Sequence, residues 1–104
     1  MQVNWALKYV PTDQSPYILD IGAGNGVLSI SLAEAGYDPK RITGIDYSDH
    51  SIHLARLIAT DREHPDITFE TGDFLQDDPT TPQGMTAGWD LLFVPDTLSN
   101  LYYH

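Results

Sequence analysis

The chain contains no cysteine, and this absence excludes a disulfide framework and a zinc site built from thiolates. Its 4 histidines form no zinc-binding pattern, so we expect no metal site. The sequence has no apolar run near the roughly 20 residues that a membrane-spanning helix needs, and no recognisable signal peptide. We therefore expect one soluble domain over residues 1–104, in the cytoplasm, with the nucleus as an open alternative.

Basic residues are scarce as well, because 5 lysines and arginines stand against 15 aspartates and glutamates. The formal net charge of −10 is the opposite of what a nucleic-acid-binding domain carries, since such a domain has to neutralise phosphates. The composition therefore argues against a DNA or RNA substrate. An acidic surface attracts basic proteins or peptides, although the same charge can serve solubility alone.

Glycine, by contrast, is concentrated in one segment. Gly22, Gly24 and Gly26 follow an apolar run that ends in Asp20, and a helical apolar pattern begins at Val27. This order predicts a strand, a tight loop and a helix N-terminus, as in open α/β sheets that bind nucleotide-like ligands. The glycine spacing differs from the dinucleotide pattern G-x-G-x-x-G, and an acid at the strand end suits an ammonium but repels a pyrophosphate. Both points favour an amino-acid-bearing nucleoside over NAD.

Two further acids follow predicted strands. Residues 41–46 form a predicted second strand that ends in Asp46, and Asp46 lies 20 residues after Gly26. An acid near this offset can accept hydrogen bonds from ribose hydroxyls. Residues 67–70 form a predicted third strand, followed by Gly72 and Asp73. Because parallel strands end at the same edge of a sheet, we expect Asp20, Asp46 and Asp73 to converge there.

These segments resemble the motifs of the class I (Rossmann-like) S-adenosylmethionine-dependent methyltransferases. The resemblance covers residues 17–94, with residues 20–26, 44–48 and 72–74 matching the first three motifs and residues 89–94 the fourth strand. It implies S-adenosylmethionine as cofactor, with its methionine part at the first motif, its ribose at the second and its adenine at the third. The cofactor-binding residues expected on this basis are Asp20, Gly22, Ala23, Gly24, Asn25, Gly26, Asp46, Tyr47, Asp73 and Phe74.

The wording of the same segments also resembles the lysine methyltransferases that act on translation elongation factor 1-alpha. That likeness implies a protein-lysine N-methyltransferase with a basic protein, an elongation factor, as substrate. The acidic phrase that normally follows the fourth strand in that group is matched comfortably only at Thr97, so we assign no catalytic residue and leave enzymatic activity of this chain open. Two alternatives stay open: a small-molecule methyltransferase, and a non-catalytic module that binds the cofactor or a partner.

Strands alternating with helices predict an α/β fold, a Rossmann-like three-layer sandwich with a mainly parallel sheet truncated after about four strands. The family order is 3-2-1-4, which leaves the fourth strand with a free edge for self-association. Helices are predicted over residues 2–9 and 25–35, with Gly36 as a left-handed cap, and from Ser48 or Asp49 to before residue 64. Residues 77–88 are predicted to be a surface loop. The helix contacts are expected at Trp5, Leu7 and Val10, and at Ile52, Ala55, Ile58 and Ala59.

Overall fold

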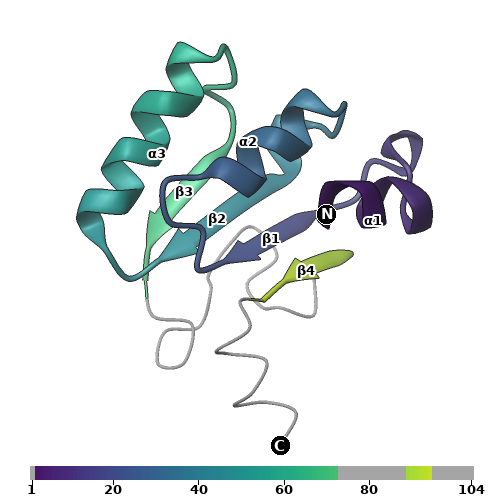
Figure 1. Ribbon diagram of the computed structural model, residues 1–104, viewed down its shortest axis with the longest axis horizontal. Coiled ribbons are helices and arrows are strands. Elements are labelled where there is room, and N and C mark those ends of the chain that lie inside the picture. Colours follow the sequence, from purple (N-terminus) through teal and green to yellow (C-terminus); the bar gives the residue numbers. More distant parts are fainter. Residues whose placement is uncertain (1, 73–88, 95–104) are drawn as a thin grey trace, which may run out of the picture.

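A computed structural model describes residues 2–72 and 89–94, which form three helices and one sheet. The strands pair in the order β3-β2-β1-β4, and every pairing is parallel (Figure 1). The predicted α/β fold and strand order are therefore confirmed. The elements are α1 (Gln2–Tyr9), β1 (Ile18–Ile21), α2 (Val27–Glu34), β2 (Ile42–Asp46), α3 (Asp49–Asp61), β3 (Thr68–Thr71) and β4 (Leu91–Phe93), with 3-10 turns at Thr12–Gln14 and Pro39–Arg41.

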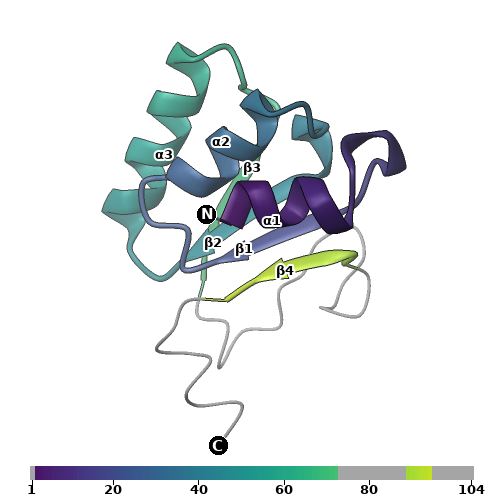
Figure 2. The ribbon, with the colours of Figure 1, turned by 45° about the vertical axis from the view of Figure 1, so that its right-hand side comes forward.

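All three helices cover the same face of the sheet, as Figures 1 and 2 show from two directions. The described residues thus form two layers, and the third layer of the predicted sandwich has no counterpart among them. The loop predicted over residues 77–88 lies outside the described residues. In the sheet, β4 is the terminal strand next to β1, as expected. Its pairing with a second copy of the chain stays a prediction. Within residues 2–72 and 89–94, no helix has the length and apolar character to cross a bilayer.

Apolar side chains fill both faces of the central strands. β1 is buried along its whole length, which is typical of a central strand in a parallel sheet. On the helical face, Ile18 of β1 and Ile42 of β2 pack in one cluster with residues of all three helices. On the opposite face, Leu19, Ile21 and Ile45 form a second buried cluster, with Trp89 and Val94 packed against it. The sheet therefore holds two cores, and both of them immobilise β1.

The predicted contacts of α1 were partly wrong. Its buried residues are Val3 and Ala6, whereas Trp5 is 52% exposed and Leu7 is exposed as well. The helix faces the core along the positions 3, 6 and 10, so Val10, which is half-buried against the core, was assigned correctly. Trp5 instead lies along the surface, with its ring centroid 5.4 Å from that of Tyr9 and 6.4 Å from that of Phe93.

The predicted contacts of α3 needed one correction. Ile52, Ala55 and Ala59 form the buried stripe of this helix, at the i, i+3, i+7 spacing of one helix face. Ile58 flanks this stripe and is exposed. The helix begins as predicted, because the Ser48 hydroxyl accepts a hydrogen bond from the Ser51 amide at 3.2 Å.

Glycines set both ends of α2. The helix begins at Val27 rather than at the predicted position 25, because Gly24 and Gly26 have positive φ angles of 56° and 85°, which a helical residue cannot adopt. Gly36, with φ 114°, is the left-handed residue predicted at the other end. Its amide donates to the Ala33 carbonyl, and the next amide donates to the Leu32 carbonyl, which is the pattern of a Schellman motif.

Polar side chains connect the segments that precede the strands to one another. Tyr37, ahead of β2, donates its hydroxyl proton to the Val10 carbonyl at 2.7 Å. Arg41 donates to the Ser15 carbonyl at 2.9 Å, and its guanidinium carbon lies 4.5 Å from the centre of the Tyr17 ring. Asp90, ahead of β4, accepts a hydrogen bond from the Tyr17 amide at 2.9 Å. The amino ends of three neighbouring strands are therefore held together by specific contacts.

Candidate functional site

The glycine loop, residues 22–26, lies at the carboxyl end of β1 and is bonded to the end of β2. The amides of Gly22 and Ala23 both donate to the Ile45 carbonyl, at 2.8 and 2.9 Å. Next along the chain, the Gly24 amide donates to Oδ1 of Asp46 at 3.4 Å. The loop and the acid that the sequence separates by 20 residues or more therefore meet at one edge of the sheet, as predicted.

Asp46 has a fixed side chain at this edge. Its Oδ2 accepts a hydrogen bond from the Ser48 amide at 3.0 Å, and its carbonyl accepts one from the Gly72 amide at 2.9 Å. The carboxylate is partly exposed, so its remaining lone pairs can accept hydrogen bonds from a ligand. The bond from Gly72 also brings the start of the third predicted motif to this edge.

Two glycines of the loop have different tasks. A Cβ on Gly24 would meet no atom within 4 Å, so the space beside this residue is open to a ligand. A Cβ on Gly26 would lie 2.8 Å from the Phe69 ring and 3.1 Å from Cβ of Ala55. Gly26 therefore admits a neighbouring side chain of the protein, whereas the backbone at Gly24 is open to close approach.

Phe69, in the middle of β3, is the residue that fixes this arrangement. Gly44 of β2 pairs with it across the sheet, and a Cβ on Gly44 would lie 2.8 Å from the Phe69 ring and 2.9 Å from Cβ of Ala23. The Phe69 ring thus occupies the space that Gly26 and Gly44 leave free, and it holds the loop against the sheet. Sequence reasoning missed this role; the one signal was an aromatic residue inside a predicted strand.

Asp20 lies within the protein at the other side of the loop, with only 4% of its surface exposed. In the sheet its direct neighbours are Phe93 of β4 and Gly44 of β2. Its Oδ2 accepts a hydrogen bond from the Ser29 hydroxyl at 2.8 Å. Burial raises the pKa of Asp20 to about 6, the hydrogen bonds from Ser29 lower it, and the charge of Asp46 raises it. Near neutral pH the group is therefore mostly a buried carboxylate.

A cavity of about 170 Å³ opens beside Asp20. It joins the glycine loop to segments that are far apart in the sequence, including the first turn of α1 and the end of β4. Gln2, Leu28, Phe93 and Val94 were not among the predicted site residues, because no local pattern links them to the loop. Phe93 alone had a usable signal, since the expected strand order sets β4 beside β1. The lining residues are Gln2, Asp20, Ile21, Gly22, Ala23, Leu28, Phe93 and Val94.

The remaining predicted residues fall into two groups. Asn25 and Tyr47 lie at the same edge and are exposed, Tyr47 by 83% of its surface. An aromatic ring so exposed has no part in the core and is available to a flat ligand. Asp73 and Phe74 lie outside the described residues, and so does every residue of the segment that follows β4 from position 95 onward.

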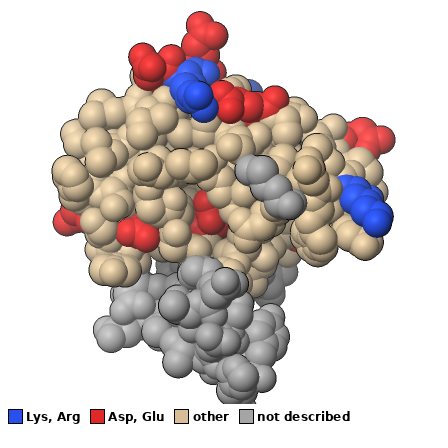
Figure 3. Space-filling view, in the orientation of Figure 1, with Lys and Arg blue, Asp and Glu red and all other residues tan. Residues whose placement is uncertain are grey.

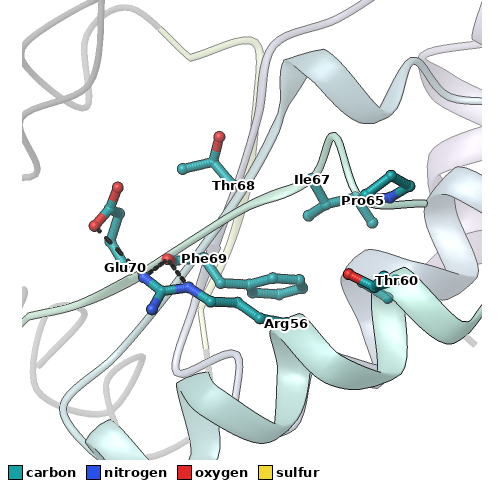
Figure 4. A pocket seen from close by; sticks show the side chains of 8 residues that line it. Arg56, Thr60, Pro65, Ile67, Thr68, Phe69 and Glu70 are labelled. Carbon is teal, nitrogen blue, oxygen red and sulfur yellow. Dashed lines mark hydrogen bonds and ion pairs between the residues drawn. The ribbon is translucent and has the colours of Figure 1, made fainter.

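A larger hollow of about 380 Å³ lies over the outer edge of β3, where α3 passes it (Figure 4). Arg56 extends across it and donates two hydrogen bonds to the Phe69 carbonyl, at 3.1 and 2.5 Å, with the Glu70 carboxylate 4.0 Å away. None of the predicted cofactor residues that the structure describes lines this hollow. Arg56 covers a backbone acceptor of an edge strand there, which protects the edge from pairing with another chain.

Charge is distributed unevenly on the face shown in Figure 3. Basic side chains are visible at the top and at the right, in each case near acidic ones or over α1. Toward the lower left, over the carboxyl ends of the strands in Figure 1, the charged side chains visible among the described residues are acidic. The described surface that is visible at this end of the sheet is therefore acidic, and such a surface favours cationic ligands.

Comparisons with known proteins place the chain in a family. Residues 13–101 match the model of a family described as "Methyltransferase domain". The chain is 40% identical over 74 residues to human EEF1A lysine methyltransferase 2, covering 70% of this chain and 30% of that protein. It is 30% identical over 102 residues to the protein-lysine N-methyltransferase efm4 of Schizosaccharomyces pombe, covering 86% of this chain and 41% of that protein.

Other relatives differ in what they act on. A ubiquinone biosynthesis O-methyltransferase of Bordetella avium is 37% identical over 57 residues, which is 55% of this chain and 22% of that protein. Among solved structures, an RNA methyltransferase of Salinibacter ruber in complex with S-adenosyl-L-homocysteine shares the fold, with a TM-score of 0.71 at 21% identity over 98% of this chain and 63% of that one. The chain spans less than half the length of each of these three curated relatives. Its motifs, sheet and relatives together show that it belongs to the Rossmann-like family of methyltransferases that use S-adenosylmethionine as cofactor.

Proposed function

We propose that the chain binds S-adenosylmethionine at the carboxyl edge of its sheet and acts as a protein-lysine N-methyltransferase on a translation elongation factor. The observation that carries the cofactor part is the open space at Gly24 beside the partly exposed Asp46 carboxylate, 3.4 Å from the Gly24 amide. A ligand can approach the backbone closely there and still donate hydrogen bonds to an acid. The residues present thus fit an adenosine-type ligand.

The carboxyl edge of the sheet would offer suitable side chains to each part of the cofactor. Asp46 would accept hydrogen bonds from the ribose hydroxyls, and the exposed Tyr47 would lie against the adenine, together with Asp73 and Phe74. Asp20, which lines the cavity of about 170 Å³, would face the ammonium of the methionine part. Gly22, Ala23, Gly24, Asn25 and Gly26 would shape the turn between these two regions. When bound, S-adenosylmethionine supplies a methyl group on a positively charged sulfur.

The protein's own tasks in such a reaction are positioning and exclusion of water. A lysine substrate has to lose a proton before its amine can attack, and we assign no residue of this chain to that step. The acidic carboxyl end of the sheet favours a cationic substrate over an anionic one. Support for the elongation factor comes from the two lysine methyltransferases among the relatives, one of which is named for EEF1A.

Calorimetric titration with S-adenosylmethionine tests the cofactor part. We expect saturable binding to the chain, no heat with NAD, and at least about tenfold weaker binding to Asp46→Ala, because a hydrogen bond to a charged group contributes roughly 1.5–3 kcal/mol. Asp49→Ala is the matched control, since it removes an exposed acid three positions away. Equal losses in both variants, or no binding by the folded chain, would contradict the assignment.

Methyl transfer then tests the substrate part. The chain is incubated with purified elongation factor 1-alpha and S-adenosylmethionine carrying a labelled methyl group, and modified lysines are located by mass spectrometry. A small-molecule methyltransferase is the second candidate, favoured by the likeness to a ubiquinone biosynthesis enzyme; it predicts transfer to a phenol and none to the protein. Cofactor binding with no transfer to either acceptor would favour a non-catalytic module.

A further inference from the structure

Ser29 contacts Asp20, one of the predicted cofactor-binding residues, although Ser29 itself lies outside the sequence motifs. It lies in the first turn of α2, is fully buried, and donates its hydroxyl proton to Oδ2 of Asp20 at 2.8 Å. The neighbouring residue Leu28 lines the cavity beside Asp20. The first turn of the helix therefore contacts the acid on one side and the cavity on the other.

The surroundings make this hydrogen bond important. Phe93 of β4 and Gly44 of β2 flank Asp20 in the sheet, and from α1 the cavity receives the neutral side chain of Gln2. Asp46 on β2 is the charged neighbour that acts on Asp20, and it is also negative. Among the described residues, Ser29 is thus the side chain that donates a hydrogen bond to the Asp20 carboxylate. Desolvation and the repulsion from Asp46 both disfavour the charged form of this acid.

We propose that Ser29 is a positioning residue for the cofactor: its hydroxyl holds one oxygen of Asp20, so that the acid is oriented to receive the ammonium of the ligand in the cavity. The inference rests on the proposed function, because it takes the cofactor's amino-acid end to lie beside Asp20. It concerns a residue outside the glycine loop and assigns to it the orientation and ionisation of the acid rather than a contact with the ligand.

The proposal predicts a specific pH dependence. Burial raises the pKa of Asp20 to about 6 and the bonds from Ser29 lower it, so removing the hydroxyl moves the pKa further up. An ammonium ligand binds the ionised acid, so affinity falls as the pH drops below this pKa. For the unaltered chain we expect about tenfold weaker binding near pH 5 than near pH 7.5.

The experiment measures binding of S-adenosyl-L-homocysteine by calorimetry between about pH 5 and about pH 7.5, where an α-ammonium stays largely protonated. We expect Ser29→Ala to weaken binding by about fivefold near pH 6 but by less than about twofold near pH 7.5, and Ser29→Thr to restore the original profile. Ser31→Ala, a half-buried serine of the same helix, is the matched control. 5′-Methylthioadenosine, which lacks the ammonium, should show no such dependence on pH or on Ser29.

A second measurement needs no ligand. The ¹³C shift of the Asp20 carboxyl group, followed against pH by NMR, should give a higher midpoint in Ser29→Ala than in the unaltered chain or in Ser31→Ala. If Ser29→Ala does not fold, Ser29→Cys keeps the volume with a weaker donor and carries the same test. An unchanged midpoint together with an unchanged binding profile would overturn the role of Ser29 while leaving cofactor binding intact. Failure of the unaltered chain to bind the ligand at any pH would instead overturn the proposed function.

Discussion

The amino ends and the carboxyl ends of the strands are held by different kinds of contact. Before the strands, Tyr37, Arg41 and Asp90 make direct hydrogen bonds to backbone groups. After the strands, Asp20 is buried with a raised pKa, and Gly24 has a left-handed backbone beside open space. One end is built for stability, and the other retains groups that a ligand can use.

The difference shows why a binding site is less stable than the scaffold that supports it. A buried carboxylate costs folding free energy unless the surrounding structure holds it. Here the two apolar clusters on either face of β1 supply that support. Variants at each end of the sheet test this difference when their stability and their ligand binding are measured separately.

The largest effect is expected for Gly26→Ala, with Gly24→Ala as its matched partner. At Gly26 a methyl group would meet Phe69 at 2.8 Å in a left-handed residue, and these two costs together amount to about 3–4 kcal/mol. At Gly24 the space is open, so only the backbone term of roughly 1–2 kcal/mol applies. Urea denaturation measures the free energy of unfolding, and calorimetry measures cofactor binding.

We expect Gly24→Ala to stay folded and to lose cofactor affinity, because its methyl group enters the space assigned to the ligand. Gly26→Ala should instead lose stability first. The division of tasks between the two glycines would be refuted if both variants lost the same stability, or if Gly24→Ala bound the cofactor normally.

The next effect is a gain of stability. The pKa of Asp20 is raised to about 6 from the ordinary 3.8, so the folded state binds a proton that the unfolded chain has released between these pH values. The free energy of unfolding therefore falls as the pH rises from about 4 to about 6, by about 3 kcal/mol in all, and stays reduced at neutral pH. Asp20→Asn keeps an acceptor for Ser29 and removes the charge.

At neutral pH, Asp20→Asn should therefore be more stable than the unaltered chain by an amount approaching this value, and it should bind S-adenosylmethionine much more weakly. Thermal denaturation at about pH 5 and about pH 7.5 checks the sign, because the gain must shrink as the pH falls. A variant less stable than the original at neutral pH would mean that Asp20 supports the fold rather than the site.

Part of this arrangement could be predicted from the sequence because it depends on local pattern. The glycine loop, the acid after the second strand and the strand order are written in short segments with fixed spacing. The contacts that give the loop its shape are not local: Phe69 is far from Gly26 in the chain, and Gln2 and Phe93 come from its two ends. Such pairs depend on packing across the sheet, which periodicity does not encode.

The errors have the same origin. Trp5 and Leu7 were expected in the core because they are large and apolar, yet the small residue Ala6 is buried in their place. The face that α1 turns inward is decided by what it packs against, and β4 lies too far along the sequence to be seen in the helix pattern. Single exposed apolar side chains are common, so their size alone is a poor guide to burial.

The smallest effect is expected at the amino ends, where Tyr37→Phe removes the hydroxyl that bonds the Val10 carbonyl. The ring of Tyr37 is buried and stays in place, so the loss is that of one hydrogen bond, about 1 kcal/mol. Tyr9→Phe, at an exposed position, should cost nothing measurable. Cofactor affinity, measured by calorimetry, should be unchanged in both variants, because the hydroxyl lies at the end of the sheet opposite to the glycine loop. Weaker binding by Tyr37→Phe would mean that the amino-end ties also set the geometry of the loop, and that the two ends of the sheet act as one unit.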